Sequence, residues 1–380
     1  MREKRWPRAN KSCSNTAPTA PTLSIPSTSA ARNLFLSEEA VALLIGIFQT
    51  YFGKRIDFNF NSESFCGMKS QIKLITSIFL LTIVSFNAYA RMINRAPIGE
   101  IPFTITGDSR IYVTAFVNGS DSLRFLVDTG ASSIVLNTNS PKLKGLIHNG
   151  DSADNLGTSG ENSIEYSNDN SIDIGTVHYD KAGCAHIPFP PEYWDGVFGL
   201  NGLAAFNIEI NYDDSKIYCY AKDTLTVDDS YILLPFDYKY NVPFVHLPIK
   251  LNGAMYNLLL EVDTGSDRVI DLNTPFVNKN NLLEMQKPFA ISRIASSDGG
   301  SGELKNVFFD EVIVGPYIMP KVAGAFSTLT SGMQSKEDID GMIGNNFLKR
   351  FNMLIDFSNN NIYLQPNNLY YTPFYDFLVK

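Results

Sequence analysis

The sequence predicts an all-β protein in which one strand-rich unit is present twice. Runs of alternating β-branched and aromatic residues, separated by turn signals, are typical of strands. The same series of strands, turns and short motifs begins near Pro97 and begins again at Leu234. The chain has 380 residues, of which 44% are apolar and 12% aromatic, so it can bury a sizeable core.

Both units open in the same way, and we expect them to span residues 98–222 and 230–372. Each starts with a Pro-Phe pair and a strand, followed by an Asn-Gly turn, a second strand and then Asp-Thr-Gly. The turns are Asn118-Gly119 and Asn252-Gly253. Asn-Gly between two strand patterns is a strong signal for a β-hairpin.

Both units also end alike. The segments that begin at Asp195 (DGVFGL) and at Asp340 (DGMIG) each predict a short strand that runs into a Gly, then a brief helix and a final hairpin. Between the opening and the end lies a glycine-rich hairpin. Its recurrence between the same flanking elements favours a functional tip over an ordinary surface turn. The candidate tip residues are Gly157, Gly160, Gly299, Gly300 and Gly302.

A targeting segment precedes the first unit. Residues 68–90 combine two lysines, an eleven-residue apolar run from Leu74 to Val84 and an Ala-x-Ala exit. This order is typical of a secretory signal peptide and predicts cleavage before Arg91. We therefore expect export to the periplasm or the medium. If residues 1–67 are part of the native protein, the alternative is that the apolar run is retained as an anchor. Residues 1–67, which are partly rich in Ser, Thr, Pro and Ala, are expected to be a non-native or disordered extension.

The charge of the chain is unevenly distributed. Residues 1–90 carry ten Lys/Arg and five Asp/Glu, whereas residues 91–380 carry 21 and 34. An acidic body argues against a nucleic-acid groove. The sequence contains no HExxH motif, and its four histidines lack metal-ligand spacing. Cys184 and Cys219 remain in the exported part, and a disulfide and two buried thiols are both open readings.

The two Asp-Thr-Gly motifs carry the strongest resemblance. Asp128–Ala131 resembles the retroviral form of the aspartic protease motif, and Asp263–Ser266 resembles the pepsin form. The chain from 98 to 366 is similar to the bacterial retropepsin-like aspartyl protease family. This resemblance implies two pseudo-symmetric β-barrel lobes with short helices and an active site at their interface. Because both motifs are in one chain, a monomer would suffice for a complete site.

The resemblance also implies a role for each motif residue. Asp128 and Asp263 would be the catalytic pair, and Thr129 and Thr264 would hydrogen-bond across the interface. Gly130 and Gly265 would let the backbone turn under the carboxylates. The glycine-rich hairpins would be flaps that close over an extended peptide substrate. The implied reaction is peptide hydrolysis by water, without a metal or cofactor.

Two carboxylates in close contact cannot both ionise, so they share one proton. Ser266 offers a hydroxyl beside Asp263, whereas Ala131 offers none beside Asp128. A hydrogen bond to a carboxylate favours its charged form. From this difference we expect Asp263 to be the ionised partner more often.

Leu126 and Glu261 are candidate substrate-binding residues. Each lies two residues before an aspartate of the pair, so strand alternation directs it to the same face. Glu261 either pairs with a Lys or Arg of the substrate or bonds to an internal cation such as Arg268 or Arg293, and the sequence leaves both readings open. Trp194 is expected to anchor the core or a loop.

Two functions from different classes fit these motifs. The first is an exported aspartic endopeptidase that acts on extended peptides or unfolded proteins. The second is a catalytically silent peptide-binding module on the same scaffold. The presence of both complete Asp-Thr-Gly motifs favours the enzyme, since a binding module would not need both carboxylates.

Overall fold

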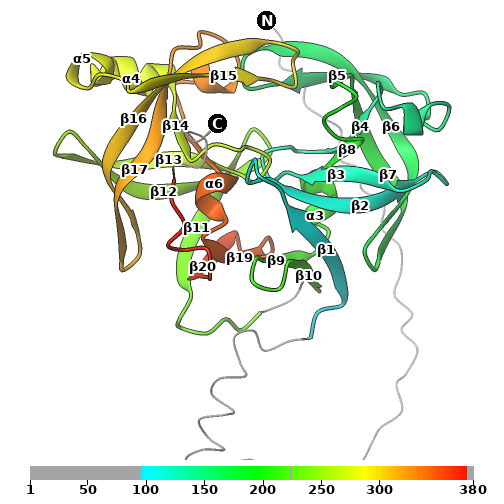
Figure 1. The fold of residues 1–380 in the computed structure, drawn as a ribbon. Coiled ribbons are helices and arrows are strands. Elements are labelled where there is room, and N and C mark those ends of the chain that lie inside the picture. Colours follow the sequence, from blue (N-terminus) through cyan, green and yellow to red (C-terminus); the bar gives the residue numbers. More distant parts are fainter. Residues whose placement is uncertain (1–95, 223–224, 375–380) are drawn as a thin grey trace, which may run out of the picture. The chain divides into compact units, whose positions relative to one another are not determined.

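The computed structural model describes residues 96–222 and 225–374, and almost all of their regular structure is β-strand (Figure 1). The all-β prediction is confirmed. The expectations for residues 1–67 and for the signal peptide at 68–90 lie outside the described residues. No helix in the described part of the chain is long and apolar enough to cross a membrane.

We call residues 96–222 the first repeat. Its strands are β1 (Gly99–Ile105), β2 (Ile111–Val117), β3 (Leu123–Val127), β4 (Ile134–Asn137), β5 (Asp151–Leu156), β6 (Glu161–Ile174), β7 (Val177–Ile187), β8 (Gly196–Phe198), β9 (Asn207–Asn211) and β10 (Lys216–Tyr220). A short 3-10 turn covers Pro141–Leu143, and helix α3 covers Leu200–Leu203.

We call residues 225–374 the second repeat. Its strands are β11 (Ile232–Lys239), β12 (Val242–Leu251), β13 (Ala254–Asp263), β14 (Ile270–Leu272), β15 (Ala290–Ala295), β16 (Ser301–Val314), β17 (Tyr317–Ser327), β18 (Gly341–Gly344), β19 (Phe351–Asp356) and β20 (Asn361–Pro366). Its helices are α4 (Thr274–Lys279), α5 (Leu282–Met285) and α6 (Asn345–Leu348), with a 3-10 turn at Met333–Ser335.

The two repeats have the same strand pairing. In the first repeat β2 pairs with β1, β3 and β6, β3 runs parallel to β8, and β4 runs parallel to β7. In the second repeat β12 pairs with β11, β13 and β16, β13 runs parallel to β18, and β14 runs parallel to β17. Adding ten to a strand's number therefore gives its counterpart.

The predicted Asn-Gly turns have the backbone that their sequence favours. Asn118 and Gly119 have φ values of 52° and 80°, and Asn252 and Gly253 have φ values of 49° and 81°. Positive φ at both central residues is the requirement of a type I′ turn. Such turns twist in the same sense as the strands, so each hairpin leads correctly into the Asp-Thr-Gly strand that follows.

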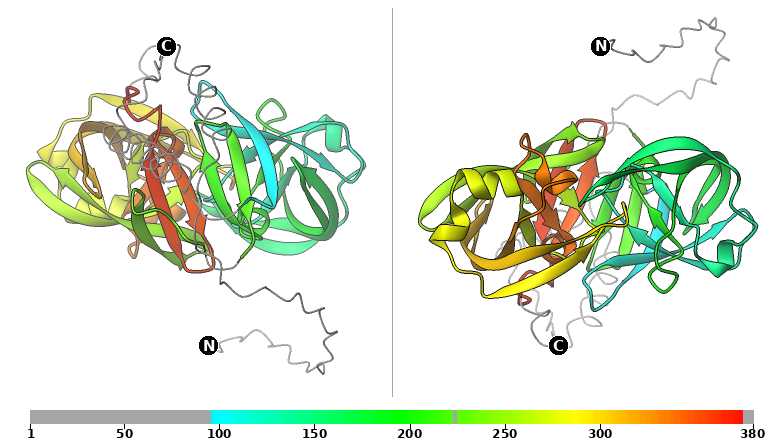
Figure 2. Two further views of the ribbon diagram at one scale, coloured as in Figure 1. Left: turned by 90° about the horizontal axis from the view of Figure 1, so that it is seen from below. Right: turned by 90° about the horizontal axis from the view of Figure 1, so that it is seen from above.

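One antiparallel sheet joins the repeats, in the order β1-β10-β9-β19-β20-β11. The strands at its two ends also belong to the repeats. Residues Gly99–Pro102 of β1 pair with β10, whereas Phe103–Ile105 pair with β2. The contact between the repeats within this sheet is the pairing of β9 with β19, seen at the bottom centre of Figure 1 and from two other sides in Figure 2.

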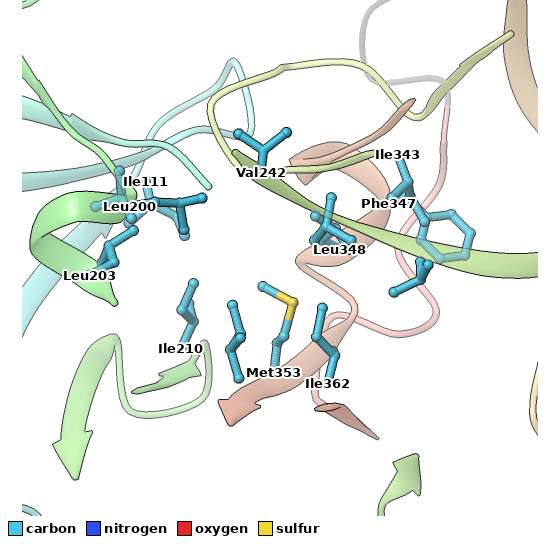
Figure 3. Close-up of a cluster of buried hydrophobic side chains, with 14 of the residues drawn as sticks. Ile111, Leu200, Leu203, Ile210, Val242, Ile343, Phe347, Leu348, Met353 and Ile362 are labelled. Carbon is cyan, nitrogen blue, oxygen red and sulfur yellow. The ribbon is translucent and has the colours of Figure 1, made fainter. Parts of the chain in front are cut away.

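Apolar side chains from both repeats pack over this joining sheet. Helix α3 contributes Leu200 and Leu203, and helix α6 contributes Phe347 and Leu348. In Figure 3, Ile210, Met353 and Ile362 of the joining sheet lie below these helix residues. Burial of these side chains stabilises the fold by roughly 25 cal/mol for each Å² of apolar surface that is removed from water.

Both cysteines of the first repeat are free and buried. Cys184 lies on β7 and Cys219 on β10. Burial raises the pKa of each thiol to about 12, so both remain neutral. The sequence left open whether these cysteines form a disulfide or are two buried thiols. In the structure they are two buried thiols.

Candidate active site

The two Asp-Thr-Gly loops follow β3 and β13 and meet at the boundary between the repeats. In each repeat this strand runs parallel to a short strand, β8 or β18, that enters a helix. The residues directly before β8 and β18, Asp195 and Asp340, help to hold these strands in place. Asp195 accepts a hydrogen bond from the Arg124 N–H at 2.8 Å, and Asp340 accepts one from the Leu259 N–H at 2.8 Å.

The two threonines join the loops by four reciprocal hydrogen bonds. The Thr129 hydroxyl donates to the Val262 carbonyl at 2.6 Å, and the Thr264 hydroxyl donates to the Val127 carbonyl at 3.0 Å. Each hydroxyl oxygen also accepts the backbone N–H of the opposite threonine at 3.1 Å. Both threonines are fully buried. The loops are therefore held at a fixed separation.

This arrangement brings Asp128 and Asp263 into a side-chain hydrogen bond with each other. The glycines make the close approach possible. A Cβ on Gly130 would lie 2.8 Å from the Asp263 carboxyl carbon, and a Cβ on Gly265 would overlap the Asp128 carboxyl. A side chain at either glycine would push the aspartates apart.

The backbone and a nearby arginine favour the ionised form of Asp128. One of its oxygens accepts the N–H groups of Gly130 at 2.8 Å and Ala131 at 3.0 Å. Burial raises the pKa of Asp128, but these bonds, the bond from Asp263 and the charge of Arg110 oppose that rise.

The surroundings of Asp263 have the opposite effect. Burial and the charges of Asp128 and Glu261 hold the pKa of Asp263 well above its usual range. One N–H, from Ser266 at 3.0 Å, opposes them. These surroundings favour the proton on Asp263 and the charge on Asp128.

Among the described residues the structure shows no bond from the Ser266 hydroxyl to Asp263, which was the basis for expecting Asp263 to be the ionised partner. The Ser266 hydroxyl oxygen accepts the backbone N–H of Arg268 at 3.2 Å. It is the Ser266 backbone N–H that contacts Asp263. Because Ala131 supplies the same kind of contact to Asp128, the Ser/Ala difference does not distinguish the two carboxyls.

Arg110 is a site residue that the sequence reasoning missed. Its Nε donates to the carbonyl of Gly265 at 2.7 Å, and its guanidinium pairs with Asp267 at 3.5 Å. An arginine of the first repeat thus supports the loop of the second. The counterpart position is the buried Val242, so a comparison of the two repeats could have singled out this arginine.

A cleft of about 1160 Å³ lies over the paired aspartates and is lined by both repeats. Leu126 and Glu261 both line it, as does Trp194, which was expected to be an anchor of the core or a loop. Trp194 packs against Phe189 at 5.3 Å between ring centroids. The volume exceeds the roughly 300–1,000 Å³ that is typical of small-molecule sites.

The glycine-rich hairpins meet across this cleft. The tip of the first, between β5 and β6, contains Gly157 and Gly160, and the tip of the second, between β15 and β16, contains Gly299 and Gly300. Gly302 instead lies within β16, where a Cβ would overlap Leu329.

Asp298 of the second tip accepts hydrogen bonds from the first. The Ser159 hydroxyl donates to Asp298 at 3.0 Å, and the Ser159 N–H donates to it at 3.2 Å. The first tip is also bound by backbone groups, because the Met333 N–H donates to the Gly157 carbonyl at 3.0 Å. We call these contacts the tip clasp. Gly157, Asp298 and Met333, which take part in these contacts, also line the cleft.

Within the described residues, no group of three or more His, Cys, Asp or Glu side chains is arranged to hold a metal ion. The hydrogen-bonded carboxyl groups of Asp128 and Asp263 can act together as one acid and one base.

Comparisons with known proteins find similarity among solved structures. No family model matches the chain, and no curated protein matches it. Among solved structures, the aspartic proteinase from Irpex lacteus is similar with a TM-score of 0.47 and 13% sequence identity. The match covers 72% of this chain and 98% of that chain.

Proposed function

We propose that the chain is an exported aspartic endopeptidase with two pseudo-symmetric, retropepsin-like β-barrel lobes, and that Asp128 and Asp263 are its catalytic residues. The observation that carries the proposal is the hydrogen-bonded pair of buried carboxyl groups in a cleft that both repeats line. One acid and one base in contact are what water-mediated peptide hydrolysis needs.

The proposed reaction begins with a water molecule held by the pair. Asp128 takes a proton from the water, whose oxygen attacks the peptide carbonyl carbon. Asp263 gives its proton to the carbonyl oxygen, so a neutral diol forms. Asp128 then passes its proton to the amide nitrogen as the C–N bond breaks. One diol hydroxyl returns a proton to Asp263, and the starting protonation is restored.

The substrate would be an extended peptide segment. The hairpins β5–β6 and β15–β16 border the cleft from opposite repeats, and an extended chain can pair with such strands. The tip clasp would open to admit the peptide and close again over it. Closure excludes bulk water from the reacting groups.

A mixed peptide library tests this proposal. The purified protein is incubated with the library, with and without a transition-state mimic such as pepstatin, beside the double variant Asp128→Asn, Asp263→Asn. We expect cleavage by the wild type alone and inhibition by the mimic. Binding of peptides without any cleavage would instead support the silent binding module. Cleavage that survives in the double variant would overturn the assignment of the site.

Export is tested separately. We propose that the full-length chain is processed at the end of residues 68–90. Mass spectrometry of the mature protein should then find an N-terminus near Arg91. Detection of residues 1–67 on the native mature protein would contradict this part of the proposal.

A further inference from the structure

Two sets of three residues at equivalent positions of the repeats line the cleft, and we call them the first and the second pocket. In the first repeat Leu126 pairs with Val197, which pairs with Val135. In the second repeat the same register brings Glu261, Met342 and Asp271 together. Two of the three apolar residues of the first pocket are therefore carboxylic acids in the second.

The first pocket is apolar. Leu126, Val135 and Val197 belong to a buried cluster with Tyr112 and Ile187. The aromatic rings of Tyr166, Phe189 and Trp194 pack against this cluster. A pocket of this composition favours a large apolar or aromatic side chain, because such a side chain leaves water on entry.

The second pocket contains an internal ion pair. The Arg268 Nε contacts both Asp271 oxygens at 3.2 Å, and its Nη2 donates to Asn306 at 2.8 Å. Asp271 is almost fully buried and has this arginine as its partner. Arg268 is thus neutralised within the pocket and is not available to Glu261. The other candidate cation, Arg293, lies 3.7 Å from Glu303.

Glu261 itself is left without a partner. It is 7% exposed, and among residues 96–222 and 225–374 no side chain or backbone group forms a hydrogen bond or ion pair with its carboxyl group. It lines the cleft, and one of its oxygens would lie 3.0 Å from a Cβ on Gly130, beside the aspartate pair. Buried carboxyl groups ordinarily have a partner.

We propose that a Lys or Arg of the substrate supplies that partner, so that the enzyme prefers a large apolar side chain on one side of the scissile bond and a basic one on the other. This inference rests on the proposed function and names the substrate class of the same site.

The charge of the cleft agrees with a cationic guest. Among the described residues that line it, nine are Asp or Glu and four are Arg. Burial and then the charge of Asp128 raise the pKa of Glu261 to about 8. An incoming ammonium or guanidinium group would lower the pKa of Glu261 and so ionise it. The two charged groups could then form a charge-assisted hydrogen bond.

The test is a cleavage-site profile of the wild type, Glu261→Gln and Glu261→Leu on one peptide library. Glutamine keeps the shape and removes the charge, and leucine is the residue of the first pocket. We expect wild-type sites to combine an apolar residue with Lys or Arg. The basic preference should fall about ten- to a hundredfold in Glu261→Gln. Glu261→Leu should instead favour apolar residues on both sides.

Glu303→Gln is the matched control, since it removes a carboxylate that lies outside the cleft lining, and its profile should equal that of the wild type. Cleavage without a basic preference, or a preference that survives in Glu261→Gln, overturns the inference and leaves the proposed function standing. If a variant fails to fold, the cleavage-site profile of the wild type alone decides whether the inference stands. No cleavage of any peptide by the wild type overturns the proposed function, and the inference with it.

Discussion

The strand ladder of the first repeat leads to an apolar pocket beside Asp128, and the same ladder in the second repeat leads to a polar pocket beside Asp263. Leu126 and Glu261 occupy the same position in this ladder, between β8 or β18 on one side and β2 or β12 on the other. Backbone hydrogen bonds fix where such a side chain lies but do not restrict its chemistry. The two repeats therefore share the same strand pairing, whereas the residues with which they line the cleft can differ.

The aspartates differ in the same way. Asp128 accepts two backbone N–H groups and lies near Arg110, whereas Asp263 accepts one N–H and lies near Glu261. These unequal surroundings favour the shared proton on Asp263, although the two loops are nearly symmetric. The predictions below either remove a difference between the repeats or test a feature that they share.

The largest effect is expected from the aspartates themselves. Asp128→Asn and Asp263→Asn should each lower kcat by about a thousandfold or more, because each removes half of one acid–base unit. Turnover is measured on a peptide that the wild type cleaves, with a thermal melt to verify folding. Substantial activity in either variant would mean that the two carboxyls do not act as a unit.

The threonine contacts should be equivalent in the two repeats. Thr129→Ala and Thr264→Ala each remove a hydroxyl that makes two buried hydrogen bonds. We expect each to lower the free energy of unfolding by about 2–5 kcal/mol, since buried donors and acceptors lose their partners. Denaturant unfolding measures this loss, and Thr129→Ser, which keeps the hydroxyl, is the control. Unequal losses would break the symmetry inferred for the loops.

Glu261 should make stability depend on pH. Its pKa is raised to about 8 in the folded protein, so it favours folding below its ordinary pKa and loses that contribution as pH rises toward 8. Each pKa unit corresponds to about 1.4 kcal/mol. Between pH 5 and pH 8 the wild type should therefore lose a few kcal/mol more stability than Glu261→Gln.

Melting temperatures of the wild type and Glu261→Gln across this pH range measure the difference. Parallel curves for the wild type and Glu261→Gln would show that Glu261 is ionised in the folded protein throughout.

Arg110 tests the electrostatic difference between the aspartates. Its charge lowers the pKa of Asp128, so Arg110→Met should move the acidic limb of the pH–rate profile to higher pH. Loss of the bond to the Gly265 carbonyl should also lower kcat/KM by about tenfold. Arg110→Lys keeps the charge and should retain the position of the limb. An unmoved limb in Arg110→Met would remove Arg110 from the account of the shared proton.

The smallest effect is expected at the tip clasp. The first tip is bound through its backbone as well as through Ser159, whereas the second contacts the first through Asp298 and the Ser296 hydroxyl oxygen. Asp298→Ala should therefore speed hydrogen exchange at residues 157–160 severalfold without unfolding the protein. In the wild type the same opening should appear as pH falls, because hydrogen bonds hold the pKa of Asp298 below its usual value against the effect of burial. Unchanged exchange would show that the backbone contacts suffice.

The duplicated framework could be predicted from the sequence because its signals are local. Asn118-Gly119, the strand patterns and the paired Asp-Thr-Gly motifs are each readable within a few residues. The partner of Arg268 could not be read in this way. Asp271 lies three residues further on, and the Arg268 guanidinium that it contacts is also held by bonds to Ser292 and Asn306, which are distant in sequence.

The error at Ser266 has a similar cause. The residue type suggested a hydroxyl bond to Asp263, whereas the turn directs that hydroxyl toward the Arg268 N–H. Arg110 was missed because its target, the Gly265 carbonyl, is 155 residues away in sequence. Contacts of this kind depend on how the two repeats are docked, which no local pattern encodes.

The β9–β19 pairing has a consequence for any attempt to produce the repeats as separate pieces. Each piece would carry a strand, β9 or β19, whose backbone N–H and C=O groups on one edge had lost their partner. Such an edge is a template for another chain. A solitary repeat would therefore tend to self-associate or aggregate. Co-production of both repeats gives each bare edge its correct neighbour, so soluble material is expected from the pair and not from either repeat alone.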